Sequence, residues 1–68
     1  MSPYQFHKLQ VGDKCMVTRG LDSGRVCVVL YKEGQRALIR TEDGEPFDSP
    51  STTDNLRLIR WSEIKIAE

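Results

Sequence analysis

The side chains that most often perform chemistry in proteins are few in this sequence of 68 residues, and they lie far apart. The single histidine, His7, comes before the first expected strand, and no serine or cysteine stands at a spacing that brings it to a base. The glycine-rich stretch 20–25 joins two strands and does not lead into a helix, unlike a phosphate-binding loop. The acidic residues at 42–48 lack the ligand spacing of a calcium loop. We therefore expect a protein that is not an enzyme, has no small-molecule substrate and carries no cofactor.

The two cysteines, Cys15 and Cys27, lie within apolar runs. Such thiols usually behave as small, reduced, hydrophobic side chains. A disulfide between them would require facing positions on neighbouring strands. With His7 the chain has only three soft metal ligands, at scattered positions and without a Cys-x-x-Cys pair, so we expect no metal site.

Charge is the most useful remaining feature, because it is unevenly distributed. The chain has ten basic and ten acidic residues, but residues 8–40 contain seven basic and three acidic ones, whereas residues 41–55 contain five acidic and no basic ones. A basic region can contact phosphates, although a dedicated nucleic-acid-binding protein usually has net positive charge. A chain with separated charges also suits docking to a protein of complementary charge.

The elements that must position these residues are predicted to be short strands. Alternating apolar residues from 14 to 18 place Cys15 and Val17 on one buried face. Three further stretches are rich in β-branched or large apolar residues, at 25–31, 36–41 and 56–61. No stretch of eleven or more residues has a helical period, so the sequence predicts one small all-β domain.

The two ends of the chain are less regular. Residues 1–9 are expected to form a lead-in segment in which Phe6 and Leu9 tuck under the sheet. Residues 62–66 predict a turn followed by a last short strand, and a single helical turn capped by Ser62 is the alternative.

The pattern of residues 12–29 is the most distinctive in the chain. It begins with Gly-Asp and alternating apolar residues, continues with a short loop between Gly20 and Gly24, and ends with a basic residue and a β-branched strand. We expect Gly24 to adopt a positive φ angle. This pattern resembles the KOW motif of some ribosomal proteins and of transcription elongation factors related to NusG. The matching residues are Gly12, Asp13, Val17, Gly20, Asp22, Gly24, Arg25, Val26 and Val29, while Cys27 replaces a glycine or small residue found in many KOW modules.

The resemblance implies a five-stranded SH3-like barrel over residues 1–68 and a non-catalytic role in binding RNA or protein. We expect a nucleic acid, a ribonucleoprotein or the transcription machinery as the ligand. Arg19 and Arg25 flank the loop and would contact phosphates, and Tyr31 offers a stacking face. The full set of expected binding residues is Lys14, Arg19, Arg25, Tyr31, Arg36 and Arg40.

The alternative function is a protein-binding adaptor or inhibitor, for example one encoded by a phage or plasmid, that docks on a host protein. In the acidic segment, Asp-Gly at 43–44 predicts a hairpin turn, and 46–48 can only be a short strand or an edge strand because proline donates no amide hydrogen bond. The candidate contact residues are Asp48 and Phe47. Phe47 either contacts a partner or plugs the barrel.

The stretch 56–61 has apolar residues on both faces. Leu58 shares one face with its alternate neighbours, and Ile59 and Trp61 share the other. We expect Ile59 to be covered, and Trp61 is either covered or a contact residue for a protein partner. The longest apolar run, residues 26–31, is too short to cross a membrane. Because the first residues also lack the pattern of a signal peptide, we expect a cytoplasmic location.

Overall fold

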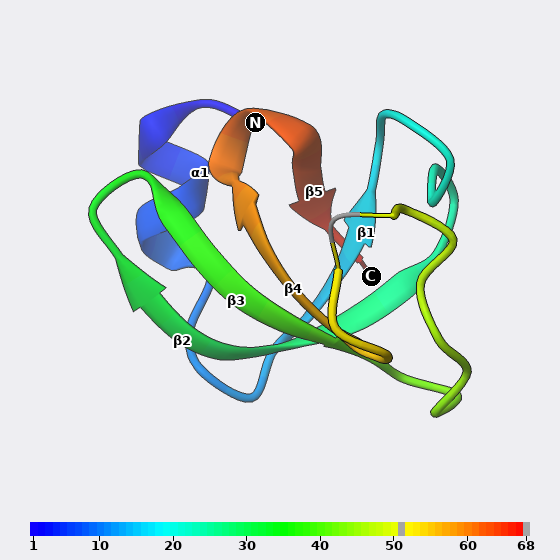
Figure 1. Cartoon of the computed structure of the whole chain (residues 1–68). Helices are drawn as coiled ribbons and strands as arrows, with labels where there is room; N and C mark the ends of the chain where they lie inside the picture. The colour runs from blue at the N-terminus through cyan, green and yellow to red at the C-terminus, as the bar shows by residue number, and fades with distance from the viewer. Residues whose placement is uncertain (51, 68) are drawn as a thin grey trace.

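The structure is a computed structural model that describes residues 1–50 and 52–67. In this part of the chain it contains a five-stranded antiparallel sheet, a short α-helix and a 3-10 helix (Figure 1). The elements in chain order are α1 (Pro3–Lys8), β1 (Lys14–Val17), β2 (Val26–Glu33), β3 (Arg36–Thr41), β4 (Leu56–Arg60), η1 (Trp61–Glu63) and β5 (Ile64–Ile66). The predicted all-β class is confirmed, and the strands at 14–18, 25–31, 36–41 and 56–61 are found within two residues of their predicted ends.

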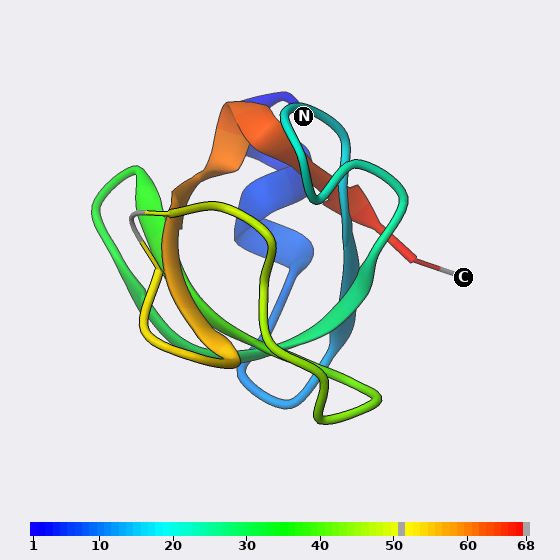
Figure 2. The same cartoon turned by 45° about the vertical axis from the view of Figure 1, so that its right-hand side comes forward.

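The sheet is strongly curled, as its topology requires. The strand order is β4-β3-β2-β1-β5, so the consecutive strands β4 and β5 lie at opposite edges. In a flat sheet, four spacings of about 4.8 Å would separate these edges by ~19 Å. The three residues of η1 connect the two strands, and a 3-10 helix rises only about 2 Å per residue. The edges must therefore approach each other, and Figure 2 shows the strands curving around a common interior.

The core fills this interior and is made by alternate residues of each strand. Cys15 and Val17 face inward from β1, as the alternation predicts, and Ile59 is covered. Phe6 and Leu9 are buried in the same core. The core consists of Phe6, Leu9, Cys15, Val17, Cys27, Val29, Ala37, Ile39, Phe47, Ile59 and Ile64.

Helix α1 was not expected, because six residues are too few to show a helical period. Its start follows from local chemistry. Ser2 is the N-cap and forms a capping box with Gln5, and Pro3 occupies the first turn. The Lys32 ammonium group hydrogen-bonds the Phe6 carbonyl oxygen at 2.6 Å, near the C-terminal end of the helix. The lead-in segment is thus a capped helix held against β2.

The acidic connection between β3 and β4 differs from its prediction. Residues 46–48 form no strand, and the Asp-Gly pair at 43–44 does not close a hairpin, because β3 ends at Thr41 and β4 begins only at Leu56. The backbone of this connection is bound by side chains from the loop between β1 and β2. These hydrogen bonds from side chains take the place of the backbone hydrogen bonds that a strand would form.

Two local predictions concern the backbone: a positive φ angle at Gly24, and the conformation of residues 62–66. Gly24 has φ = +92°, as expected from the loop between β1 and β2. At the other end, η1 begins at Trp61 with Arg60 as its N-cap and no side-chain cap. The proposed capping role of Ser62 is therefore wrong, whereas the predicted last strand at residues 64–66 is present as β5.

Candidate binding surface

The clearest candidate site is the face of β2, β3 and β4 that points away from the core, here called the outer face. Tyr31, Leu38 and Leu58 lie in register across these three strands, because Tyr31 pairs with Leu38 and Leu38 pairs with Leu58. Tyr31 is 55% exposed, Leu58 is 56% exposed and Leu38 is half-buried. We call these three side chains the apolar row. Other exposed apolar residues, such as Tyr4 and Leu21, lie on α1 and on a loop and belong to no such row.

The row next to the apolar row on the outer face is basic. Arg36 on β3 pairs directly with Arg60 on β4, and Glu33 on β2 pairs with Arg36 from the other side. Like charges at directly opposed positions of an antiparallel pair destabilise a sheet. Among residues 1–50 and 52–67, neither Arg36 nor Arg60 forms an ion pair. Glu33 offsets part of the charge of Arg36, whereas Arg60 is exposed and has Arg36 opposite it in the register, so the two arginines keep a net positive charge that an anionic group can meet.

Arg40 borders the apolar row on its other side. It pairs with Val28 on β2 and with Leu56 on β4, and it is partly buried. Its guanidinium donates a hydrogen bond of 3.3 Å to the carbonyl oxygen of Thr41. Three arginines thus surround the apolar row, two of them from the predicted set and one, Arg60, missed by it.

The surface around Leu58 is hollowed on both sides. One open hollow of about 440 Å³ is lined by Glu33, Gln35, Arg36 and Leu58. A second hollow, of about 340 Å³, is lined by Leu38, Thr52, Thr53, Leu56, Arg57 and Leu58. Leu58 therefore forms a ridge between two open depressions.

The predicted basic residues of the hairpin are placed differently: Lys14 shares a cross-strand row with Arg40 through Val28, whereas Arg19 and Arg25 lie in the loop between β1 and β2. Lys14 lies on β1 and forms an ion pair of 2.6 Å with Glu42. It lines an open hollow of about 530 Å³ on the other part of the sheet, together with Lys65 and Ile66 of β5. Arg19 is exposed in the loop between β1 and β2. Glu42 therefore offsets the charge of Lys14. Arg19 lies in a loop and is not part of the cross-strand rows that contain the outer-face arginines.

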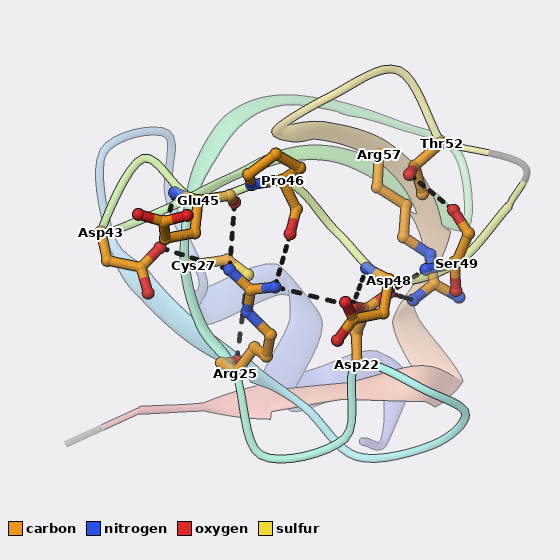
Figure 3. A network of polar contacts seen from close by, with 10 residues as sticks. All are labelled: Asp22, Arg25, Cys27, Asp43, Glu45, Pro46, Asp48, Ser49, Thr52 and Arg57. Carbon is orange, nitrogen blue, oxygen red and sulfur yellow. Dashed lines mark hydrogen bonds and ion pairs between the residues drawn. The ribbon is translucent and has the colours of Figure 1, made fainter.

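Arg25 was expected to contact phosphates, but its guanidinium is bound within the protein (Figure 3). It donates hydrogen bonds to the carbonyl oxygens of Pro46 at 2.7 Å and Glu45 at 3.0 Å, and to the Asp43 carboxylate at 3.3 Å. Its side chain is only 19% exposed. In the structure Arg25 therefore holds the acidic connection against the hairpin loop, and its expected phosphate contact stays a prediction.

Asp22 completes this internal network and was missed as an important residue. Its side chain is fully buried and accepts backbone hydrogen bonds from Asp48 at 2.7 Å and from Ser49 at 3.2 Å. Arg57 on β4 pairs with it at 3.3 Å (Figure 3). Burial by itself raises the pKa of Asp22, but these hydrogen bonds and the Arg57 charge outweigh it and hold the pKa below its usual value. In the sequence, its match to the KOW pattern and its place in a Gly-rich loop were the signals for this residue.

The three candidate protein contacts, Phe47, Asp48 and Trp61, differ in their exposure to solvent. Phe47 is only 7% exposed and belongs to the core, under the Arg25 guanidinium, which favours the plugging role over a partner contact. The backbone of Asp48 is bound by Asp22, while its side chain is exposed. Trp61 is partly buried and packs against the core from η1.

The remaining chemistry-bearing residues do not gather into a further site. His7 is exposed on α1. Cys15 and Cys27 face each other in the β1–β2 register, and both are free and buried. Within residues 1–50 and 52–67, no three histidine, cysteine or carboxylate side chains are grouped to hold a metal ion. In the same part of the chain, no helix is long and apolar enough to pass through a bilayer. Comparison of the chain with known protein families, with curated proteins and with solved structures found no match.

Proposed function

We propose that this protein is a non-catalytic binding module whose ligand docks on the outer face of β2, β3 and β4. The observation that carries this proposal is the exposed apolar row beside the directly opposed Arg36 and Arg60. An ordinary solvated sheet face has little reason to place two large apolar side chains in water and two like charges opposite each other. Tyrosine and arginine are also enriched at the centres of binding interfaces.

We propose further that the curled sheet is a small SH3-like barrel of the KOW type. The short η1 link between opposite edges of the sheet supports this proposal, because it draws the edges together. The positive φ angles of Gly20 and Gly24 also support it, since the motif places glycines at both ends of its loop.

A nucleic acid or ribonucleoprotein ligand is one candidate for this module. Tyr31 could stack on a base, and Arg36, Arg40 and Arg60 border the apolar row to which it belongs. The basic hairpin on which this candidate first depended gives it less support, because Lys14 and Arg25 are bound to acidic or carbonyl groups of the same chain. A protein partner is the other candidate, and the leucines of the apolar row favour it. Both candidates use the same face.

Site-specific photo-crosslinking tests the location of the interface. A benzophenone amino acid placed at position 58 should yield adducts in a lysate of the source organism, whereas the same amino acid at position 21 should not. Leu21 is a matched control because it is 70% exposed but lies on the loop between β1 and β2. Equal labelling from both positions, or none from position 58, would reject the outer face as the interface. Treatment with nuclease before irradiation reports whether the adduct is a nucleic acid.

A further inference from the structure

We infer that the outer face binds an acidic protein segment, in which carboxylate side chains alternate with or adjoin apolar ones. This inference rests on the proposed function and specifies its ligand. The composition of the apolar row, the shape around Leu58 and the charges that border it support such a ligand.

The composition of the apolar row favours a protein ligand over a nucleic acid. Sequence-tolerant binding of single strands depends on successive bases stacked on aromatic side chains. Among the three residues of the row, only Tyr31 is aromatic, and Leu38 and Leu58 have branched aliphatic side chains without a planar face. Aliphatic side chains instead pack well against the apolar side chains of another protein.

The shape of the surface points to side chains as the groups that are bound. Leu58 stands between two separate open hollows, one bordered by Arg36 and the other by Leu38 and Leu56. A polypeptide lying across the ridge would place side chains into the hollows on either side. In the first hollow Arg36 stands beside Glu33 and Gln35, and in the second Arg57 and two threonines stand beside Leu38 and Leu56. Both hollows therefore suit a side chain that combines an apolar stem with a polar end, such as glutamate.

The pattern of charges favours single carboxylates over a continuous phosphate backbone. Arg36 and Arg60 form one local positive centre, but Glu33 stands next to Arg36 in the same cross-strand row. A phosphate chain running along this row would meet the Glu33 carboxylate, whereas one carboxylate can bind between the two arginines. Zero net charge of the whole chain points the same way, since phosphate binding depends on accumulated positive charge.

Fluorescence anisotropy with defined probes tests this inference. The probe is a short labelled peptide of alternating glutamate and leucine, and the comparison ligands are a lysine–leucine peptide of equal length, oligo(dT) and oligo(U). We expect the full chain to bind the glutamate–leucine peptide, and binding to the other three ligands to be at least about tenfold weaker, a difference typical of complementary charge at an interface. Added salt should weaken the binding.

Substitutions locate the binding and separate it from folding. Leu58→Asp and Arg60→Glu should each weaken peptide binding by about tenfold or more, whereas Leu21→Asp and Lys8→Glu, at exposed positions of the β1–β2 loop and of α1, should leave it unchanged. Arg60→Glu has a second readout, because it converts the opposed arginines into an oppositely charged pair with Arg36 and should raise the denaturation midpoint. Gain of stability with loss of binding would distinguish a ligand-binding arginine from a structural one.

Three results would overturn the inference in distinguishable ways. Preferential binding of an oligonucleotide, weakened by Leu58→Asp, would reject the acidic segment but leave the outer face as the interface. Peptide binding that Leu58→Asp and Arg60→Glu do not change would reject both the inference and the proposed function. Absence of peptide binding at millimolar concentration would reject the acidic segment, and photo-crosslinking at position 58 would then decide whether the proposed function survives.

Discussion

The buried carboxylate of Asp22 provides the most direct test of how this fold is held together. Its two oxygens accept hydrogen bonds from the backbone of Asp48 and Ser49 and pair with Arg57. Asp22→Asn removes the negative charge and replaces one acceptor oxygen with an NH₂ group, which cannot accept a bond from any of these donors. Hydrogen bonds to a charged group contribute about 1.5–3 kcal/mol each, and breaking a buried ion pair costs about 3–5 kcal/mol.

We expect Asp22→Asn to lower the free energy of unfolding by roughly 2–4 kcal/mol, because one acceptor oxygen remains. A chain of this length has a total stability of roughly 3–10 kcal/mol, so the loss should be large or should unfold the protein. Urea denaturation followed by the fluorescence of Trp61, which packs against the core, measures the change. The control is Asp54→Asn, because Asp54 is exposed and its substitution changes the charge by the same amount.

The pH dependence gives a second readout of the same network. Because the pKa of Asp22 is lower in the folded state than in the unfolded chain, its contribution to stability is present above the ordinary aspartate value, about 3.9, and is lost as the pH falls through the folded value. The pKa of Asp43 is also lowered, by the hydrogen bond from the Glu45 backbone and by Arg25, so Asp22→Asn should reduce the acid dependence without abolishing it. A denaturation midpoint and an acid slope equal to those of Asp54→Asn would refute this account of the network.

Gly24→Val should lower the free energy of unfolding by more than about 1 kcal/mol, because Gly24 has φ = +92° and a side chain there meets only backbone strain, with no atom within 4 Å of an added Cβ. Equal urea midpoints for this variant and the wild type would contradict the assigned loop conformation. The thiols of Cys15 and Cys27 should resist modification in the folded protein, since burial raises their pKa to about 12 and about 11, respectively, and neither is exposed. Labelling with a thiol reagent at pH 8 should proceed only at the rate of unfolding, and rapid labelling under native conditions would argue against the buried positions.

The strands of this protein could be predicted because their signal is local. In a strand the side chains alternate between two faces, so Cys15 and Val17 are assigned to the core from their spacing alone. Gly24 was equally predictable, because a tight loop between two strands often requires a positive φ angle. The sequence signals for helix α1 were only its capping box and Pro3. A search for a helical period does not detect these signals, because the helix has only six residues.

The acidic connection could not be predicted from its own residues. Its Asp-Gly pair and Pro46 favour a hairpin and an edge strand in isolation. Its conformation is instead fixed by Asp22 and Arg25, which are about twenty or more positions away in the sequence. Long-range side-chain contacts to the backbone override local turn preferences here, because buried or half-buried polar groups must find partners.

The availability of the charges for binding was likewise decided by the tertiary structure. In the sequence, Lys14 and Arg25 are as basic as Arg36 and Arg60, and nothing local distinguishes them. The fold places acidic and carbonyl groups against Lys14 and Arg25. The sheet register instead sets Arg36 and Arg60 opposite each other on an open face. The sequence alone thus determined most of the strand side chains that enter the core, since burial in a strand follows a period of two, whereas the burial of Phe47 was decided by the tertiary structure. Only the pairing of strands, which brings distant residues together, decided which arginines and leucines form a surface.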